Sequence, residues 1–236
     1  CFAVRDALKD DLDIPVFHDD QHGTAIVVLA ALNNASQLRN VSHDDKIVIS
    51  GAGAAGLATA DLLLHAGYTN ITVLDSKGIL APSRNDMNRY KERVADITNP
   101  DDHTGDLSMA IRDADVFIGV SIGGILTQAH VERMADNPVV FALANPDPEI
   151  DPEKARDAGA GIIATGRSDH PNQVNNALVF PGLFNGLIEA DKNNVELDDM
   201  VRVAQAIADT VEPRQDKILP DVFNQDVVRS ITESLA

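Results

Sequence analysis

The residues of this chain that are suited to chemistry gather in an acidic segment at residues 17–25 and a glycine-rich segment at residues 51–56. The first reads Phe-His-Asp-Asp-Gln-His-Gly-Thr-Ala and the second Gly-Ala-Gly-Ala-Ala-Gly. Carboxylate oxygens are the ligands that Mg²⁺ and Mn²⁺ prefer, so the first segment indicates a hard-cation site. A Gly-x-Gly-x-x-Gly turn that joins a strand to a helix is typical of a dinucleotide-binding site. The two segments together favour a dehydrogenase that holds an oxyacid through a metal ion.

The glycine-rich segment has the flanking pattern that a dinucleotide site requires. We predict a strand at 46–50, a helix from the turn to about His65, and a second strand at 71–74. Gly51 then allows the tight turn, Gly53 lets the backbone approach a pyrophosphate, and Gly56 permits close helix packing. A tight turn without a ligand is the alternative interpretation. The predicted cofactor-binding residues are Gly51, Ala52, Gly53, Ala54, Ala55, Gly56, Asp75, Ser76, Ser121 and Asn145.

The choice of coenzyme depends on Asp75, which closes the second predicted strand. A carboxylate there binds the ribose hydroxyls of NAD and repels the 2′-phosphate of NADP, which favours NAD. However, Ser76, Lys77, Arg84 and Lys91 are close enough in sequence to contact a phosphate. NADP therefore stays open.

Strands alternate with helices along the rest of the chain. Further strands are expected at 116–120, 139–143 and 162–165, with helices at 1–12, 24–38, 85–95, from Thr127, and at 180–190, 198–210 and 226–235. This alternation predicts an α/β, Rossmann-like, doubly wound and mostly parallel sheet with helices on both faces and a helical C-terminal segment. We place a remnant of a preceding domain at 1–22 and the dinucleotide-binding domain at 23–236.

The Asp19–Asp20 pair has simpler explanations than a metal site. Carboxylates before a helix serve as caps and as a solvated loop, with Asp20 or Gly23 as the capping residue. A zinc site built from His18 and His22 has the right spacing, but we expect the two residues to bracket a loop. Neither explanation accounts for the whole segment.

Two more segments, 141–149 (Phe-Ala-Leu-Ala-Asn-Pro-Asp-Pro-Glu) and 166–176 (Gly-Arg-Ser-Asp-His-Pro-Asn-Gln-Val-Asn-Asn), complete a pattern. All four segments resemble, in order and spacing, the cofactor-binding half of bacterial malic enzymes. The resemblance implies metal-dependent oxidative decarboxylation of malate to pyruvate with NAD(P), and Mg²⁺ or Mn²⁺ bound by Asp20 with Asp19 behind it. It implies substrate binding by Asn145, Asn175 and Asn176, and Ser121 near the nicotinamide ribose. The family's catalytic Lys and Tyr, and its Glu-Asp metal pair, lie upstream, so no catalytic residue is expected in this chain.

Two other functions fit parts of the pattern. A noncatalytic NAD-sensing module needs the glycines and Asp75 but has no use for Asp20, Asn145 or Asn176. An amino-acid dehydrogenase of similar two-domain design does not require the acidic segment. Dependence on Mn²⁺ separates malic enzyme from both.

The composition and net charge of the chain limit the classes of partner that it can bind. The 236 residues carry a formal net charge of −18, which argues against nucleic-acid binding. The acidity fits an ordinary solvated surface or adaptation to high salt. No membrane segment or secretory signal is visible, and one cysteine fits a reducing compartment, so we expect a cytoplasmic protein. The chain starts without Met inside a predicted helix, so we expect a fragment of a homodimeric or larger homo-oligomeric enzyme.

Overall fold

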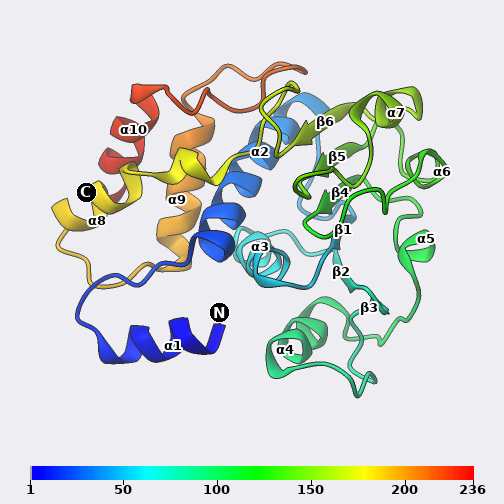
Figure 1. Cartoon of the computed structure of the whole chain (residues 1–236), viewed down its shortest axis with the longest axis horizontal. Helices are drawn as coiled ribbons and strands as arrows, with labels where there is room; N and C mark the ends of the chain where they lie inside the picture. Colours follow the sequence, from blue (N-terminus) through cyan, green and yellow to red (C-terminus); the bar gives the residue numbers. More distant parts are fainter. Residues whose placement is uncertain (1) are drawn as a thin grey trace.

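A six-stranded β-sheet with helices on both faces forms the centre of the molecule (Figure 1). The computed structural model describes residues 2–236, apart from the side chain of Asp10. The strands are β1 (Ile47–Ser50), β2 (Ile71–Asp75), β3 (Gly78–Ile79), β4 (Val116–Gly119), β5 (Val139–Ala142) and β6 (Ile162–Thr165). The predicted fold class and the five predicted strands are confirmed.

The strand order is β3-β2-β1-β4-β5-β6. All neighbouring strands are parallel except β3, which pairs antiparallel to β2 at the edge of the sheet. The two-residue strand β3 was not predicted, because two residues are too short to show a periodicity. The chain winds outward in opposite directions from β1 and β4. Open α/β sheets bind ligands at such a switch point, beyond the carboxyl ends of the strands.

The strands alternate their side chains between two apolar cores. Ile47, Ile49 and Phe141 face one core, whereas Val48 and Phe117 face the other. This alternation follows from the two-residue period of a strand. Because every residue of β1, β4, β5 and β6 is buried, these strands read as continuous apolar runs.

Long helices cover the first face and short ones the second. The first core contains residues of α2 (Thr24–Arg39), α3 (Ala54–His65), α8 (Gly182–Glu189), α9 (Leu197–Ala208) and α10 (Gln225–Leu235). The second contains residues of α5 (Leu107–Ala110), α6 (Gln128–Val131) and α7 (Pro152–Asp157). The chain also forms α1 (Phe2–Asp11), a π-helix (Asp19–Gly23), α4 (Arg89–Thr98) and a 3₁₀-helix (Asn176–Val179).

Two helices start later than predicted, for local reasons. Helix α4 begins at Arg89 because the Asn88 side chain accepts hydrogen bonds from the backbone N–H groups of Tyr90 and Lys91. Helix α8 begins at Gly182 because Phe180 precedes a proline and is extended. The capped helix predicted after Thr127 is present as α6.

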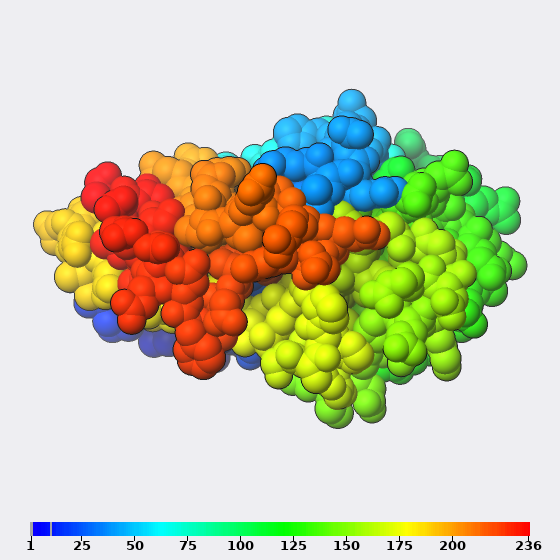
Figure 2. Space-filling model, turned by 90° about the horizontal axis from the view of Figure 1, so that it is seen from above, coloured from blue at the N-terminus to red at the C-terminus, as the bar shows by residue number. Residues whose placement is uncertain are grey.

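Buried amides attach the C-terminal part of the chain to the sheet domain. Asn34 of α2 donates hydrogen bonds to the carbonyls of Ala208 and Ile218. Asn172, after β6, donates to the carbonyl of Gln215. In Figure 2 the orange segment accordingly lies between the blue α2 and the yellow-green segment after β6. The proposed domain boundary at residue 22 falls inside the π-helix and stays a prediction.

Membrane insertion has no candidate element in the described part of the chain. Within residues 2–236, no helix combines the length and the apolar character needed to cross a bilayer.

Replacing Gly56 with alanine is expected to destabilise the fold by about 3 kcal/mol, as overpacking of a rigid site does. An added Cβ would lie 1.7 Å from the carbonyl oxygen of Gly51. Urea unfolding of the variant should show a lower midpoint with an unchanged slope. Gly159→Ala would be a poor control because, although the Cβ position is open, the positive φ of 100° strains any side chain. The control is Ala55→Gly, in the same helix as Gly56, which should lower the free energy of unfolding by ~1 kcal/mol. A Gly56→Ala midpoint equal to wild type would contradict the packing described.

Candidate active site

The glycine turn lies at the switch point between β1 and β4. Gly51 has a positive φ of 122°, and a Cβ there would meet the carbonyl oxygen of Val120 at 2.6 Å. Gly53 is exposed, and an added Cβ would find no atom within 4 Å. In the described chain no side chain caps the start of α3, so its first N–H groups are available to an anion. The glycine geometries match those of a phosphate-binding turn.

Two more predicted residues come to the same edge of the sheet. Ser121 follows β4, and its hydroxyl lies 3.4 Å from the Ser50 hydroxyl at the end of β1. Asn145 follows β5 and is exposed. The carboxyl ends of β1, β4 and β5 therefore present Gly51, Ser121 and Asn145 side by side.

Asp75 is paired with two cationic side chains, Arg84 and Lys91, which we predicted only as possible contacts of a coenzyme phosphate. Arg84 contacts both carboxylate oxygens, at 2.9 and 3.0 Å, and Lys91 contacts one at 2.6 Å. Burial by itself raises the pKa of Asp75, but the hydrogen bonds from Arg84 and Lys91 lower that pKa to about 2. The charge of Asp75 is thus already compensated by Arg84 and Lys91. Ser76 follows it in the exposed turn before β3.

This pairing predicts an acid-sensitive contribution to stability. The folded-state pKa of Asp75 lies below its unfolded value of 3.8, so the stabilisation is present above about pH 4 and is lost as the pH falls toward 2. Asp75→Asn should lower the free energy of unfolding by about 2 kcal/mol at pH 7 and by about half that at pH 3. Urea titrations at both pH values measure the difference. A deficit that does not shrink in acid would contradict the ion pairing.

The acidic segment is a π-helix that runs directly into α2, not the predicted loop. Of the two capping candidates, Gly23 stands at the N-cap position of α2, whereas Asp20 does not, and no side chain caps either helix start. Both Asp19 and Asp20 are exposed, and Asp19 accepts a hydrogen bond of 2.5 Å from the side-chain amide of Asn176. Burial and the neighbouring charge of Asp20 raise the pKa of Asp19. Single-turn π-helices occur frequently at functional sites.

Asn175 and Asn176, which we predicted to bind substrate, have different environments. Asn176 reaches Asp19 across 157 residues of sequence. The side-chain oxygen of Asn175 accepts the backbone N–H of Ala177 and caps the 3₁₀-helix. The π-helix packs against both that 3₁₀-helix and α3. The structure therefore joins the acidic segment to Asn176, with Asn175 beside it as the cap.

The histidines do not form the zinc pair considered above. His22 is half-buried, and Arg5 of α1 donates hydrogen bonds to its Nε2 and to the side-chain oxygen Oε1 of Gln21, both at 2.9 Å. Burial and the Arg5 charge lower the pKa of His22 to about 4, so the ring is neutral at pH 7. The ring therefore serves to dock α1 on the π-helix.

The acidic segment fits part of a hard-cation shell. Asp19 and Asp20 offer exposed carboxylate oxygens beside the Asn176 amide. Within residues 2–236, no three Asp, Glu, His or Cys side chains lie close enough together to hold a metal by themselves. Mg²⁺ and Mn²⁺ take about six oxygen ligands, so further oxygens must come from substrate, water or other protein residues.

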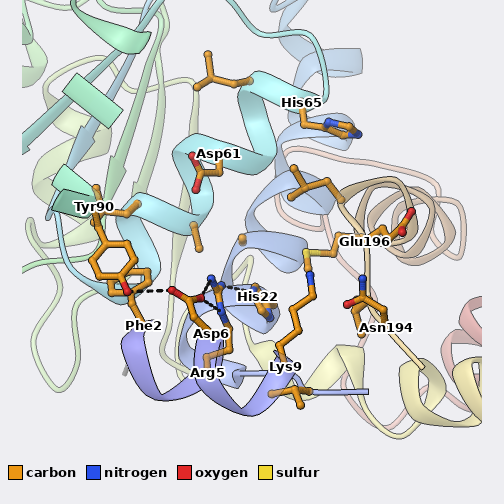
Figure 3. Close-up of a pocket in the computed structure, with 18 of the residues that line it drawn as sticks. Phe2, Arg5, Asp6, Lys9, His22, Asp61, His65, Tyr90, Asn194 and Glu196 are labelled. Atoms are coloured by element: carbon orange, nitrogen blue, oxygen red, sulfur yellow. Dashed lines mark hydrogen bonds and ion pairs between the residues drawn. The ribbon is translucent and has the colours of Figure 1, made fainter. Parts of the chain in front are cut away.

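A cavity of about 1080 Å³ lies between α1, α3 and the start of α9, with His22 and Ala25 of the acidic segment in its wall. Figure 3 shows Arg5, Asp6 and Lys9 of α1 on one side of it and Asp61 and His65 of α3 on the other. None of the residues predicted to bind cofactor, substrate or metal lines this cavity. The candidate coenzyme site is therefore the sheet edge that carries the glycine turn, Ser121 and Asn145.

Comparison with known proteins agrees with this geometry. Residues 21–236 match the family model described as "Malic enzyme, NAD binding domain". This chain belongs to the malic enzyme family. Among similar proteins is the bifunctional malic/malolactic enzyme of Bacillus subtilis, 47% identical over all of this chain and 59% of that protein. The NADP-dependent malic enzyme of Halomonas elongata is 44% identical over 97% of this chain and 54% of its own length.

Solved malic enzyme structures have the same fold. The NAD-dependent malic enzyme of Thermotoga maritima superposes with a TM-score of 0.94 at 45% identity, over 100% of this chain and 63% of that one. The chain thus spans little more than half the length of the curated malic enzymes described above. The prediction of the family, of an NAD(P)-binding domain and of a Rossmann-like fold is confirmed.

Proposed function

We propose that this chain is the coenzyme-binding part of an enzyme that oxidises and decarboxylates malate to pyruvate and CO₂ while reducing NAD(P). The observation that carries the proposal is the contact between Asp19 of the π-helix and Asn176. It brings the oxygen-rich segment and the substrate amides together in a domain whose sheet edge also carries the phosphate turn. A dinucleotide-binding module alone has no need of this contact.

The roles of the residues follow from their positions. The turn at 51–56 and the start of α3 bind the pyrophosphate, and Ser121 and Asn145 lie beside the nicotinamide ribose. Asn145, Asn175 and Asn176 hold the malate carboxylates and orient C2 toward the nicotinamide without adding charge.

Asp20, with Asp19 behind it, would hold Mg²⁺ or Mn²⁺. When bound, such a cation supplies Lewis-acid polarisation of the C2 oxygen, which eases loss of CO₂. We assign the proton transfers to the catalytic Lys and Tyr that the resemblance to malic enzymes implies.

The coenzyme preference rests on the environment of Asp75. A lone carboxylate repels a 2′-phosphate, but Asp75 shares its charge with Arg84 and Lys91. We propose NAD as the preferred coenzyme, because Asp75 can accept hydrogen bonds from ribose hydroxyls while its cations remain paired. Use of NADP requires Arg84 or Lys91 to leave that pairing. A homodimer or larger homo-oligomer and a cytoplasmic location also stay predictions.

The test uses the full-length protein with malate, NAD or NADP, and Mn²⁺, followed by absorbance of the reduced coenzyme. We expect turnover that requires malate and stops when a chelator removes the metal. Coenzyme binding without turnover would favour the sensing module. Metal-independent turnover of an amino acid would favour the amino-acid dehydrogenase.

A further inference from the structure

A fully buried carboxylate lies behind the ligand-binding edge of the sheet. The side chain of Glu149 is 0% exposed. Its Oε1 accepts the backbone N–H of Ser121 at 2.9 Å, and its Oε2 accepts the backbone N–H of Ala144 at 2.9 Å. Ser121 follows β4, whereas Ala144 follows β5 and immediately precedes Asn145. One carboxylate therefore joins the two loops that carry the proposed nicotinamide-side residues.

The neighbouring strand leaves space for this carboxylate. Gly119 is the last residue of β4, and a Cβ added there would lie 2.3 Å from the Glu149 carboxyl carbon and 2.6 Å from Oε1. No positive φ requires a glycine at this position. The three atoms nearest to that added Cβ all belong to Glu149, so a side chain at Gly119 would displace the carboxylate.

The backbone of the same segment adds further connections between the loops. The N–H of Leu126 donates to the carbonyl of Glu149, and the N–H of Gly124 donates to the carbonyl of Pro148. Burial raises the pKa of Glu149, and the hydrogen bonds from Ser121 and Ala144 oppose that change. A buried acid is costly unless its oxygens are paired. Here both of its oxygens are used to join two loops.

We propose that Glu149 is a positioning residue that sets the spacing of Ser121 and Asn145 around the nicotinamide half of the coenzyme. This role deepens, and rests on, the proposed coenzyme-binding function. Glu149 reaches no ligand itself, because it is buried behind the loops. It acts through the two backbone N–H groups that donate to it and through the Ser121 hydroxyl, which donates to Oε1 at 3.4 Å. The adenine and pyrophosphate half binds at the turn after β1, which Glu149 does not contact.

The experiment compares two probes of the full-length protein by calorimetry: NAD⁺, and ADP, which lacks the nicotinamide ribose. In Glu149→Gln, an NH₂ group replaces one acceptor and faces a backbone N–H, so one loop loses its connection. We expect the Kd for NAD⁺ to rise about tenfold, as loss of a buried charged hydrogen bond does, with the Kd for ADP unchanged. Gly119→Ala, which displaces the same carboxylate, should produce the same split. Glu153→Gln, at an exposed position of α7, is the matched control and should bind both probes as wild type does.

A second measurement does not depend on how well the variants fold. In the wild-type protein, hydrogen exchange should show slow amides at Ser121 and Ala144 beside faster ones at Ile122 and Asn145. Fast exchange at Ser121 and Ala144 would overturn the proposal. So would a Glu149→Gln variant that loses NAD⁺ and ADP equally, or neither. Failure of coenzyme binding itself is distinct, because wild type would then bind neither probe.

Discussion

Replacing Gly53 with valine is expected to abolish NAD(P) binding while leaving the fold intact. The residue lies exposed at the start of α3, and a Cβ there meets no protein atom within 4 Å. The valine side chain therefore does not disturb the protein but occupies the space that the pyrophosphate needs. Loss of the hydrogen bonds to the helix start, at ~1.5–3 kcal/mol each, should weaken binding by about 100-fold or more. Calorimetric titration with NAD⁺ measures the loss.

Side chains of increasing size at position 53 separate a loss of coenzyme binding from a loss of stability. Gly53→Ala adds a single methyl group and should weaken NAD⁺ binding less than valine does, with the melting temperature near wild type for both. Gly56→Ala, three residues later, should lower stability instead, because its Cβ meets the carbonyl oxygen of Gly51. Unchanged NAD⁺ affinity in Gly53→Val would refute the assignment of this turn.

Replacing Asp20 with asparagine is expected to reduce malate turnover in the full-length protein by about 100-fold or more, since metal catalysis contributes several kcal/mol. The amide keeps the shape of the side chain but removes one anionic ligand, so Mn²⁺ affinity should fall as well. Binding of NAD⁺ should be unaffected, because the phosphate turn does not include this residue. Metal titrations and steady-state kinetics measure the two losses.

Asp13→Asn is the matched control for this substitution. Asp13 is also exposed and belongs to the link between α1 and the π-helix, so the same charge is removed close by in sequence. Its metal affinity and turnover should equal those of wild type. Wild-type values in Asp20→Asn itself would show that the carboxylate is only part of a solvated surface.

Local sequence patterns predicted those parts of the site that lie within one short stretch of the chain. The glycines at 51, 53 and 56 have fixed spacing and flanking apolar runs, so the turn and its strand and helix were predictable. The π-helix was not, because one extra residue in a helical turn leaves no periodic signature in five residues. The polar residues of this segment, such as the exposed Asp20 and the buried Gln21, are equally compatible with a loop.

Contacts between distant segments account for what the sequence left open. The pairing of Asp75 with Arg84 and Lys91 depends on how α4 packs near β2, which propensities do not encode. Asn175 and Asn176 look equivalent in sequence, yet one caps the 3₁₀-helix and the other reaches Asp19. The role of Glu149 was not predicted for the same reason. Its burial depends on the space beside Gly119, a residue that is distant in sequence.

The most direct test of the central claim is the product stoichiometry of the full-length protein supplied with malate, NAD⁺ and Mn²⁺. Reduced coenzyme, pyruvate and CO₂ would be measured in the same reaction, with Asp20→Asn run in parallel. We predict one pyruvate and one CO₂ for each coenzyme reduced, and loss of all three together in the variant. Coenzyme reduction that yields oxaloacetate without CO₂, or full activity in Asp20→Asn, would contradict the assignment of this sheet edge to oxidative decarboxylation.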